Sequence, residues 1–242
     1  MANPAPNPPY DALARVSGAF RPATPIDSET LFAGRRRQME RILDVVLQPG
    51  QHAVVYGIRG VGKTSLARVM SDILRRAGTT MANFYTCNSG DSFDAIWRSV
   101  LEDIEMTYLA PPTGFAGAAD EDSVSALDVI GRLVTNADGS PRPIRPDDVR
   151  RAFSVRPDGG PHQVVIIDEF DRVQDRTVRA LFADTIKSLS DQGVPATVIL
   201  VGVADSVDQL IDEHPSVERS VAQIHMPAML SLIHISEPTR PY

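Results

Sequence analysis

The stretch Gly57-Ile58-Arg59-Gly60-Val61-Gly62-Lys63-Thr64-Ser65 (GIRGVGKTS) decides the fold of this chain. Its two outer glycines, its lysine and its threonine match the pattern G-x-x-x-x-G-K-[ST]. The run before it, residues 52–56 (HAVVY), is apolar and β-prone, which predicts a strand. Residues 64–75 carry apolar side chains at helical spacing, which predicts a helix. A strand, a glycine-rich turn and a helix therefore follow one another.

This order of elements predicts that residues 57–65, here named the phosphate loop, bind a nucleotide. Backbone N–H groups and the positive end of the helix face the anion, and glycines let the main chain approach it. Lys63 is predicted to reach the β- and γ-phosphates, and the Thr64 hydroxyl to bind Mg²⁺. Arg59 either adds a positive charge near the nucleotide or points to solvent, and the sequence leaves both open.

Composition limits the other possibilities. A length of 242 residues suits one α/β domain with a core and short extensions. The net charge of -7 argues against a generally basic surface for nucleic acid, although a local patch stays open. A single cysteine, Cys87, excludes an internal disulfide, and we expect it to pack at a strand end. The chain has neither an apolar run of about 20 residues nor a secretory signal, so the cytoplasm is the expected compartment.

Strand and helix patterns alternate along the chain. Further strands are expected at 82–87, 164–167, 197–201 and 220–226, and helices at 39–47, 91–108 and 178–189. The helical stripe that contains Trp97 is expected to pack in the core. This alternation predicts a parallel, doubly wound sheet.

Three regions depart from this pattern. Residues 1–30 form an N-terminal extension whose proline-rich first ten residues are expected to be disordered. Prolines and glycines interrupt residues 110–162, which we expect to be an insertion or a functional loop with short helices near 123–133 and 146–153. Residues 230–242 resemble the translation of a transposon-end sequencing adapter, so the native chain is expected to be cut off near Met229.

Two acidic residues follow the apolar strand at 164–167. Asp168 and Glu169 are expected beside the phosphate loop, because ligands gather at the carboxyl ends of parallel strands. Asp168 is suited to hold Mg²⁺ through its water shell. Glu169 is suited to polarise the water that attacks the γ-phosphate, which is the role of a general base.

The phosphate loop, VVIIDEFD (164–171) and TVILVGVAD (197–205) together resemble the AAA family of ATPases, nearest to its origin-recognition-like and signalling branch. The resemblance covers about residues 31–229. It implies the P-loop NTPase fold, a three-layer α/β/α sandwich around a mainly parallel sheet, and Mg²⁺-dependent hydrolysis of ATP. It also implies that Arg35, in the Phe32-Ala33-Gly34-Arg35 entry motif, lies near the adenine.

The resemblance implies further roles. Asp205, or Ser206, falls where the family keeps a polar sensor, although an aspartate there would repel the γ-phosphate. Arg219 falls where the family has an arginine finger that acts on a neighbouring subunit, which implies a homo-oligomer; a surface salt bridge is the alternative. The family's helical lid is expected to be missing from this chain. The partner stays open between DNA and a protein effector.

Three functions fit these observations. The first is an ATPase that drives a conformational change. The second is a nucleotide-dependent switch or scaffold with little turnover, in a DNA-associated, regulatory or defence assembly. The third is a small-molecule phosphotransferase, which fits an acidic pair after an apolar strand less well than water activation does.

Overall fold

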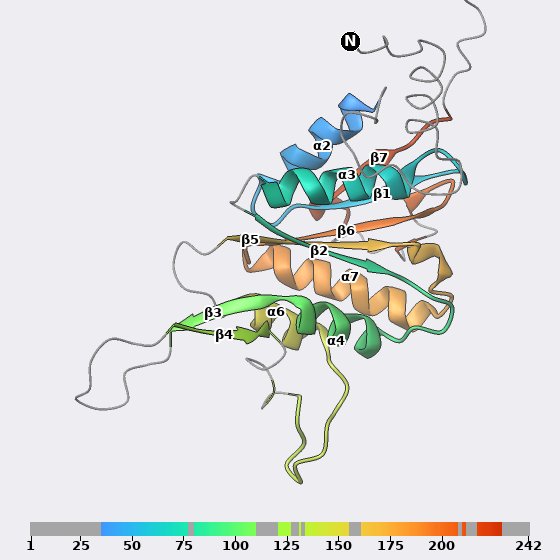
Figure 1. The fold of residues 1–242 in the computed structure, drawn as a ribbon. Helices are drawn as coiled ribbons and strands as arrows, with labels where there is room; N and C mark the ends of the chain where they lie inside the picture. Colours follow the sequence, from blue (N-terminus) through green and yellow to red (C-terminus); the bar gives the residue numbers. More distant parts are fainter. Residues whose placement is uncertain are drawn as a thin grey trace, which may run out of the picture.

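The structure is a computed structural model that describes residues 35–76, 80–109, 121–126, 131, 134–154, 161–207, 210–211 and 217–228. Within these ranges five parallel strands form one sheet in the order β2-β5-β6-β1-β7 (Figure 1). Their bounds are β1 His52–Gly57, β2 Thr80–Thr86, β5 His162–Asp168, β6 Ala196–Val203 and β7 Val221–His225. The parallel, doubly wound sheet that the sequence predicts is confirmed.

Helices cover both faces of the sheet, giving three layers (Figure 1). Helices α2 (Arg36–Val46) and α3 (Lys63–Arg76) bury their apolar side chains on one face. The opposite face is covered by α4 (Phe93–Asp103), α6 (Pro146–Ser154) and α7 (Arg176–Asp191). The central strands are buried on both sides, which explains the apolar runs of residues 164–167 in β5 and 198–201 in β6.

Core packing agrees with the sequence-based expectations for two residues. Trp97 is fully buried in the cluster between the sheet and α4, α6 and α7. Cys87 is also fully buried, directly after β2, where its N–H donates to the Asp168 carbonyl at 2.9 Å. Burial raises the pKa of the Cys87 thiol to about 12, so this thiol stays protonated at neutral pH.

The carboxyl ends of the central strands meet at one edge of the sheet. Gly57, the last residue of β1, is level with Val203, the last residue of β6. Asp168, the last residue of β5, is level with Thr86 of β2. The segments that follow β1, β5 and β6 are therefore neighbours at this edge, which we name the carboxyl edge.

The structure corrects two helix predictions. The helix expected over 91–108 ends at Asp103, and β3 (Glu105–Leu109) follows it. The helix expected near 123–133 is also wrong at its start, because β4 (Glu121–Ser125) pairs with β3 in an antiparallel hairpin. Backbone pairing between these two segments outweighs a helical spacing of apolar residues, which is a weak local preference.

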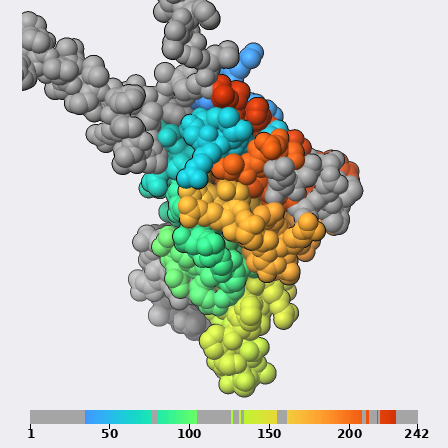
Figure 2. Space-filling model, turned by 90° about the vertical axis from the view of Figure 1, so that its right-hand side faces the viewer, coloured from blue at the N-terminus to red at the C-terminus, as the bar shows by residue number. Residues whose placement is uncertain are grey.

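The expected insertion contains ordered elements. The short helix expected at 146–153 is confirmed as α6. The segment before it, coloured yellow-green in Figures 1 and 2, projects from the body of the molecule and is closed by a bridge between Thr135 and Pro141. Residues 1–34, including Phe32 to Gly34, and the adapter-like residues 230–242 lie outside the described residues.

None of the helices in the described ranges combines the length and the apolar character that crossing a bilayer requires.

Candidate functional site

The phosphate loop connects β1 to α3 at the carboxyl edge. Gly57 passes so close to the segment after β7 that an added Cβ would lie 2.4 Å from the Met226 carbonyl oxygen. Gly62 has a φ of +89°, in the left-handed region that side chains other than glycine rarely adopt. Close approach at one end and a left-handed backbone at the other explain the two glycines of the motif.

Lys63 begins α3 and folds over the loop. Its Nζ donates hydrogen bonds of 2.9 Å to the carbonyl oxygens of both Gly57 and Ile58, and only 8% of the residue is exposed. Burial lowers the pKa of this ammonium group, while the charges of Asp171 and Asp168 act in the opposite direction. The lysine is thus held at the centre of the loop with two carboxylates near it.

Asp168 ends β5 next to the start of α3. It is 2% exposed, and the Thr64 hydroxyl hydrogen-bonds to its carboxylate. Burial raises the pKa of Asp168, and the hydrogen bond from Thr64 and the charge of Arg68 oppose the shift. Its Oδ2 has no hydrogen-bond partner among the described residues. A buried carboxylate oxygen without a hydrogen-bond partner is suited to bind a cation or a water molecule of its hydration shell.

Glu169 follows Asp168 in a left-handed backbone conformation, with a φ of 54°. For a residue other than glycine such a conformation costs about 1–3 kcal/mol and persists only where neighbouring contacts impose it. It turns the chain into the short 3-10 helix η2 (Phe170–Arg172). The Glu169 carboxylate forms an ion pair of 2.7 Å with Arg172, and both side chains are partly exposed at the carboxyl edge.

Asp171 belongs to the same site although the sequence analysis gave it no role. Its Oδ1 accepts a hydrogen bond of 2.8 Å from the Val203 N–H at the end of β6. It also stands first among the carboxylates that act on the Lys63 ammonium. The only signal in the sequence is the third acidic residue of the segment DEFD, and it does not reveal a contact across 32 residues.

Arg35 and Arg59 take different positions. The Arg35 guanidinium is 4% exposed and donates to the carbonyl oxygens of Val61 in the phosphate loop, at 3.0 Å, and of Pro227, at 2.7 Å. It therefore supports the main chain of the loop. Arg59 is exposed at the surface. Figure 2 faces the carboxyl edge and shows the cyan phosphate-loop region near the gold segment that follows β5.

The structure separates Asp205 from Arg219. Asp205 is exposed two residues after β6, and so lies at the carboxyl edge. Arg219 precedes β7 at the opposite edge, where its carbonyl oxygen accepts a hydrogen bond of 3.2 Å from the Gln51 side chain. Val221, two residues later, is level with the first residue of β1. Arg219 therefore does not lie at the carboxyl edge with the phosphate loop, and its role as an arginine finger stays a prediction.

The side-chain oxygens of Thr64 and Asp168 suit a magnesium ion that also binds water and phosphate. They are too few to hold a metal ion by themselves. No group of three or more His, Cys, Asp or Glu side chains suited to a metal gathers among the described residues. Thr64 and Asp168 supply one hydroxyl and one carboxylate side by side. Mg²⁺ needs few protein ligands, because it keeps several waters and binds phosphate oxygens.

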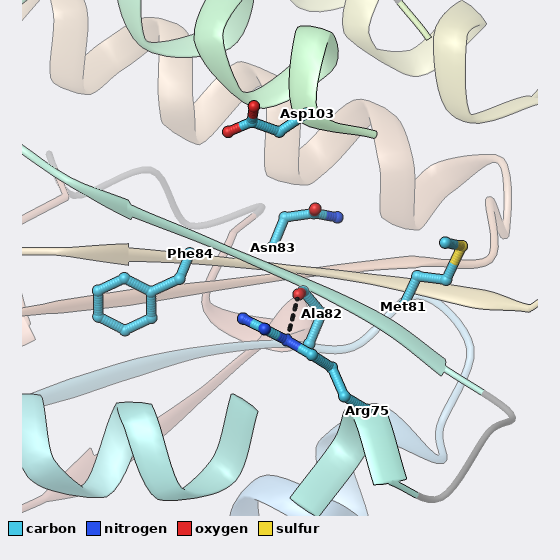
Figure 3. A pocket seen from close by; sticks show the side chains of 6 residues that line it. All are labelled: Arg75, Met81, Ala82, Asn83, Phe84 and Asp103. Carbon is cyan, nitrogen blue, oxygen red and sulfur yellow. Dashed lines mark hydrogen bonds between the residues drawn. The ribbon is translucent and has the colours of Figure 1, made fainter. Parts of the chain in front are cut away.

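A separate pocket lies beside the edge strand β2, with a volume of about 390 Å³ (Figure 3). It is lined by Arg75, Met81, Ala82, Asn83, Phe84 and Asp103. Within it the Arg75 Nε donates to the Ala82 carbonyl oxygen at 3.1 Å. None of these lining residues belongs to the phosphate loop or to the turn after β5, so the pocket is distinct from the candidate site.

The parallel sheet and the glycine-rich loop between β1 and α3 define the fold of the P-loop nucleoside triphosphatases. A family model described as the AAA ATPase domain matches residues 31–201. The match covers more than half of the chain, and the chain belongs to the AAA ATPase family. No curated protein sequence is similar enough to it to count as a relative.

Several solved structures are similar to this chain at low sequence identity. A Walker-type ATPase of Pyrococcus abyssi has a TM-score of 0.50 and 15% identity, over 84% of this chain and 56% of that chain. The ORC1 protein of Aeropyrum pernix in complex with DNA has a TM-score of 0.48 and 14% identity, over 81% of this chain and 46% of that chain. Cdc6p of Pyrobaculum aerophilum has a TM-score of 0.47 and 16% identity, over 87% of this chain and 48% of that chain. This chain spans about half the length of the solved chains that it matches.

Proposed function

We propose that this chain binds ATP with Mg²⁺ at the phosphate loop and hydrolyses it to ADP and phosphate. One observation carries the proposal. The Thr64 hydroxyl and the buried Asp168 carboxylate lie in hydrogen-bond contact beside Lys63, and the second oxygen of Asp168 has no partner among the described residues. Within this family such an arrangement supports binding of a magnesium triphosphate.

Each residue has a defined part in the proposed site. The N–H groups of the phosphate loop and the start of α3 would face the phosphates. The Lys63 ammonium would exchange its bonds to Gly57 and Ile58 for phosphate oxygens. Thr64 and Asp168 would hold Mg²⁺, directly and through water. When bound, the ion would neutralise charge that develops on the β- and γ-phosphates.

The proposed reaction needs a base for water. The water oxygen attacks the γ-phosphorus, the bond from that phosphorus to the bridging oxygen breaks, and ADP leaves. The Glu169 carboxylate would orient the water and accept its proton. In the structure this carboxylate is paired with Arg172 at the carboxyl edge, so it would have to leave this ion pair to act on water.

Two substitutions test the proposal. Lys63→Ala should abolish measurable ATP binding in calorimetry, because the centre of the loop loses its cation. The matched control is the chain's other lysine, through Lys187→Ala on α7, which should bind ATP like the wild type. Unchanged affinity in Lys63→Ala would contradict the phosphate site.

Glu169→Gln separates an ATPase from a switch or scaffold. A general base contributes about 10²–10⁴-fold to turnover, so phosphate release should fall by that factor while ATP affinity stays close to that of the wild type. Glu102→Gln, on the exposed side of α4, is the control. A wild-type chain that binds ATP with no turnover dependent on Glu169 would instead support the switch.

A further inference from the structure

The turn after β5 carries Glu169, and its backbone needs support from outside. Within the turn the Arg172 N–H donates to the Glu169 carbonyl oxygen at 2.9 Å, and the Val173 N–H to that of Phe170 at 3.1 Å. These local bonds close one 3-10 turn but do not fix its place relative to the sheet. The left-handed Glu169 shows that contacts beyond the turn impose its conformation.

Two residues of the turn supply such contacts. Phe170 is fully buried, and its ring centroid lies 4.9 Å from that of Phe182 on α7. Asp171 contacts β6 instead, where its Oδ1 accepts the Val203 N–H at 2.8 Å. Val203 is level with Gly57 in the neighbouring strand, which is the first residue of the phosphate loop. Of the two contacts, the one through Asp171 therefore leads from the turn to the strand end beside the phosphate loop.

The end of β6 is shaped for this contact. A Cβ added at Gly202 would lie 3.1 Å from the Asp171 nitrogen, 3.2 Å from its Oδ1 and 2.7 Å from a methyl carbon of Leu210. A side chain at Gly202 would therefore push the turn away from the strand. Asp171 and Gly202 form one close junction between the turn and β6.

We propose that Asp171 is a positioning residue: by tying the turn to the end of β6, it holds the Glu169 carboxylate in register with the phosphate loop. The inference rests on the proposed hydrolysis, in which Glu169 acts on water. Asp171 acts through Glu169 and is not itself a catalytic residue. A displacement of about 1 Å in a reacting group lowers turnover by as much as about 10²-fold, so a hydrogen bond at this point has a measurable effect.

The test compares two substitutions of Asp171 in the 242-residue chain. Asp171→Ala removes the acceptor, and should lower kcat by about 10–100-fold while the Kd for ATP with Mg²⁺ changes by less than about threefold. Asp171→Asn keeps an oxygen that accepts the Val203 N–H, so kcat should stay within about threefold of the wild type. Equal losses in the two variants would show that charge, not the hydrogen bond, matters, and would overturn the inference.

Asp175 provides the matched control. Its carboxylate also accepts a main-chain N–H, that of Thr177 at 2.8 Å, but at the start of α7 and away from β6. Asp175→Ala should destabilise the fold through its lost helix cap and leave kcat unchanged. A loss of kcat as large as that of Asp171→Ala would point to a general structural effect and contradict positioning.

A second variant approaches the junction from β6. Gly202→Ala should reproduce the loss of kcat with ATP binding retained, because its methyl group meets the turn. Amide hydrogen exchange at Val203 gives a readout independent of turnover. Exchange should be faster in Asp171→Ala than in Asp171→Asn or Asp175→Ala, and equal exchange in all three would exclude the tie.

Failure of the inference is distinguishable from failure of the proposed function. Wild-type turnover that depends on Glu169 but not on Asp171 would overturn the inference alone. A wild-type chain without turnover would overturn the proposed function, and the catalytic part of the inference with it.

Discussion

His52 is a buried histidine whose surroundings do not favour its protonated form. It is fully buried in β1, its Nδ1 accepts the Val198 N–H at 2.9 Å, and its Nε2 has no partner in the described part of the chain. Burial, with a smaller effect of His162, lowers its pKa from 6.5 to about 3. The folded protein therefore holds this ring neutral where the unfolded chain would protonate it.

This difference predicts a loss of stability in acid. The unfolded state binds a proton below pH 6.5 that the folded state takes up only near pH 3, so stability is present above pH 6.5 and decreases as the pH falls. For His52 alone the free energy of unfolding should drop by about 1.4 kcal/mol between pH 7.5 and pH 5.5. Urea denaturation at the two pH values measures it.

The control is the same experiment on two variants. His52→Asn removes the titrating ring, and should reduce the pH dependence by that amount whatever its effect on stability at pH 7.5. His225→Asn makes the same change at an exposed histidine of β7 and serves as the comparison. A pH dependence of His52→Asn equal to that of the wild type would contradict the assignment.

Single residues also show where inference from sequence ends. Lys63, Thr64 and Asp168 could be selected because a fixed spacing and an apolar strand place them, and the structure brings them together. Asp171 could not, because its contact is with a main-chain N–H 32 residues later. Which main-chain groups remain available at a strand end depends on the neighbouring strands, and spacing does not encode that.

At the scale of elements, α7 joins the candidate site to the core. Its Phe182 contacts three aromatic rings, with centroids 4.9 Å away for Phe170, 5.2 Å for Phe93 and 5.7 Å for Trp97. These rings come from the turn after β5 and from α4. One side chain of α7 thus packs against both the helix layer and the turn that carries Glu169.

Phe182→Ala should therefore lower the free energy of unfolding by about 3–5 kcal/mol, since it removes a fully buried ring and leaves a cavity. Its neighbour Leu181 is only half-buried. Replacing a fully buried leucine by alanine lowers the free energy of unfolding by at least about 2 kcal/mol, so Leu181→Ala should lower it by less than that. Chemical denaturation of both variants measures the difference. Equal losses would show that the aromatic cluster is not the centre of this layer.

Elements differ in how well their sequences predict them. The strands β5 and β6 were predictable, because apolar runs rich in β-branched residues suit strands buried on both faces. The hairpin of β3 and β4 was not, because each strand is defined by pairing with the other, and Glu105 pairs with Ser125, 20 residues later. A local pattern reports what one segment prefers, and not which partner it will find.

At the scale of the whole molecule, one side chain joins the two ends of the described chain to the phosphate loop. Arg35 precedes α2, and its guanidinium bonds to the Val61 carbonyl oxygen and, 192 residues along the chain, to that of Pro227. The segment with Pro227 follows Met226, which packs against Gly57. The buried Arg35 guanidinium therefore links the phosphate loop, the start of α2 and the segment after β7.

Arg35→Ala should destabilise the fold and weaken ATP binding together. The buried Val61 carbonyl oxygen loses its donor, which costs about 1–3 kcal/mol, and the link to the more exposed Pro227 carbonyl oxygen is also lost. The phosphate loop also loses support, so the rise in Tm on adding ATP and Mg²⁺ should be smaller than in the wild type. Thermal unfolding with and without ATP measures both effects.

Arg36→Ala is the control, because the Arg36 side chain is 91% exposed and pairs only with Glu40 within the described structure. A full shift of Tm in Arg35→Ala would show that the loop holds its shape without this arginine, and would restrict Arg35 to joining α2 to the segment after β7.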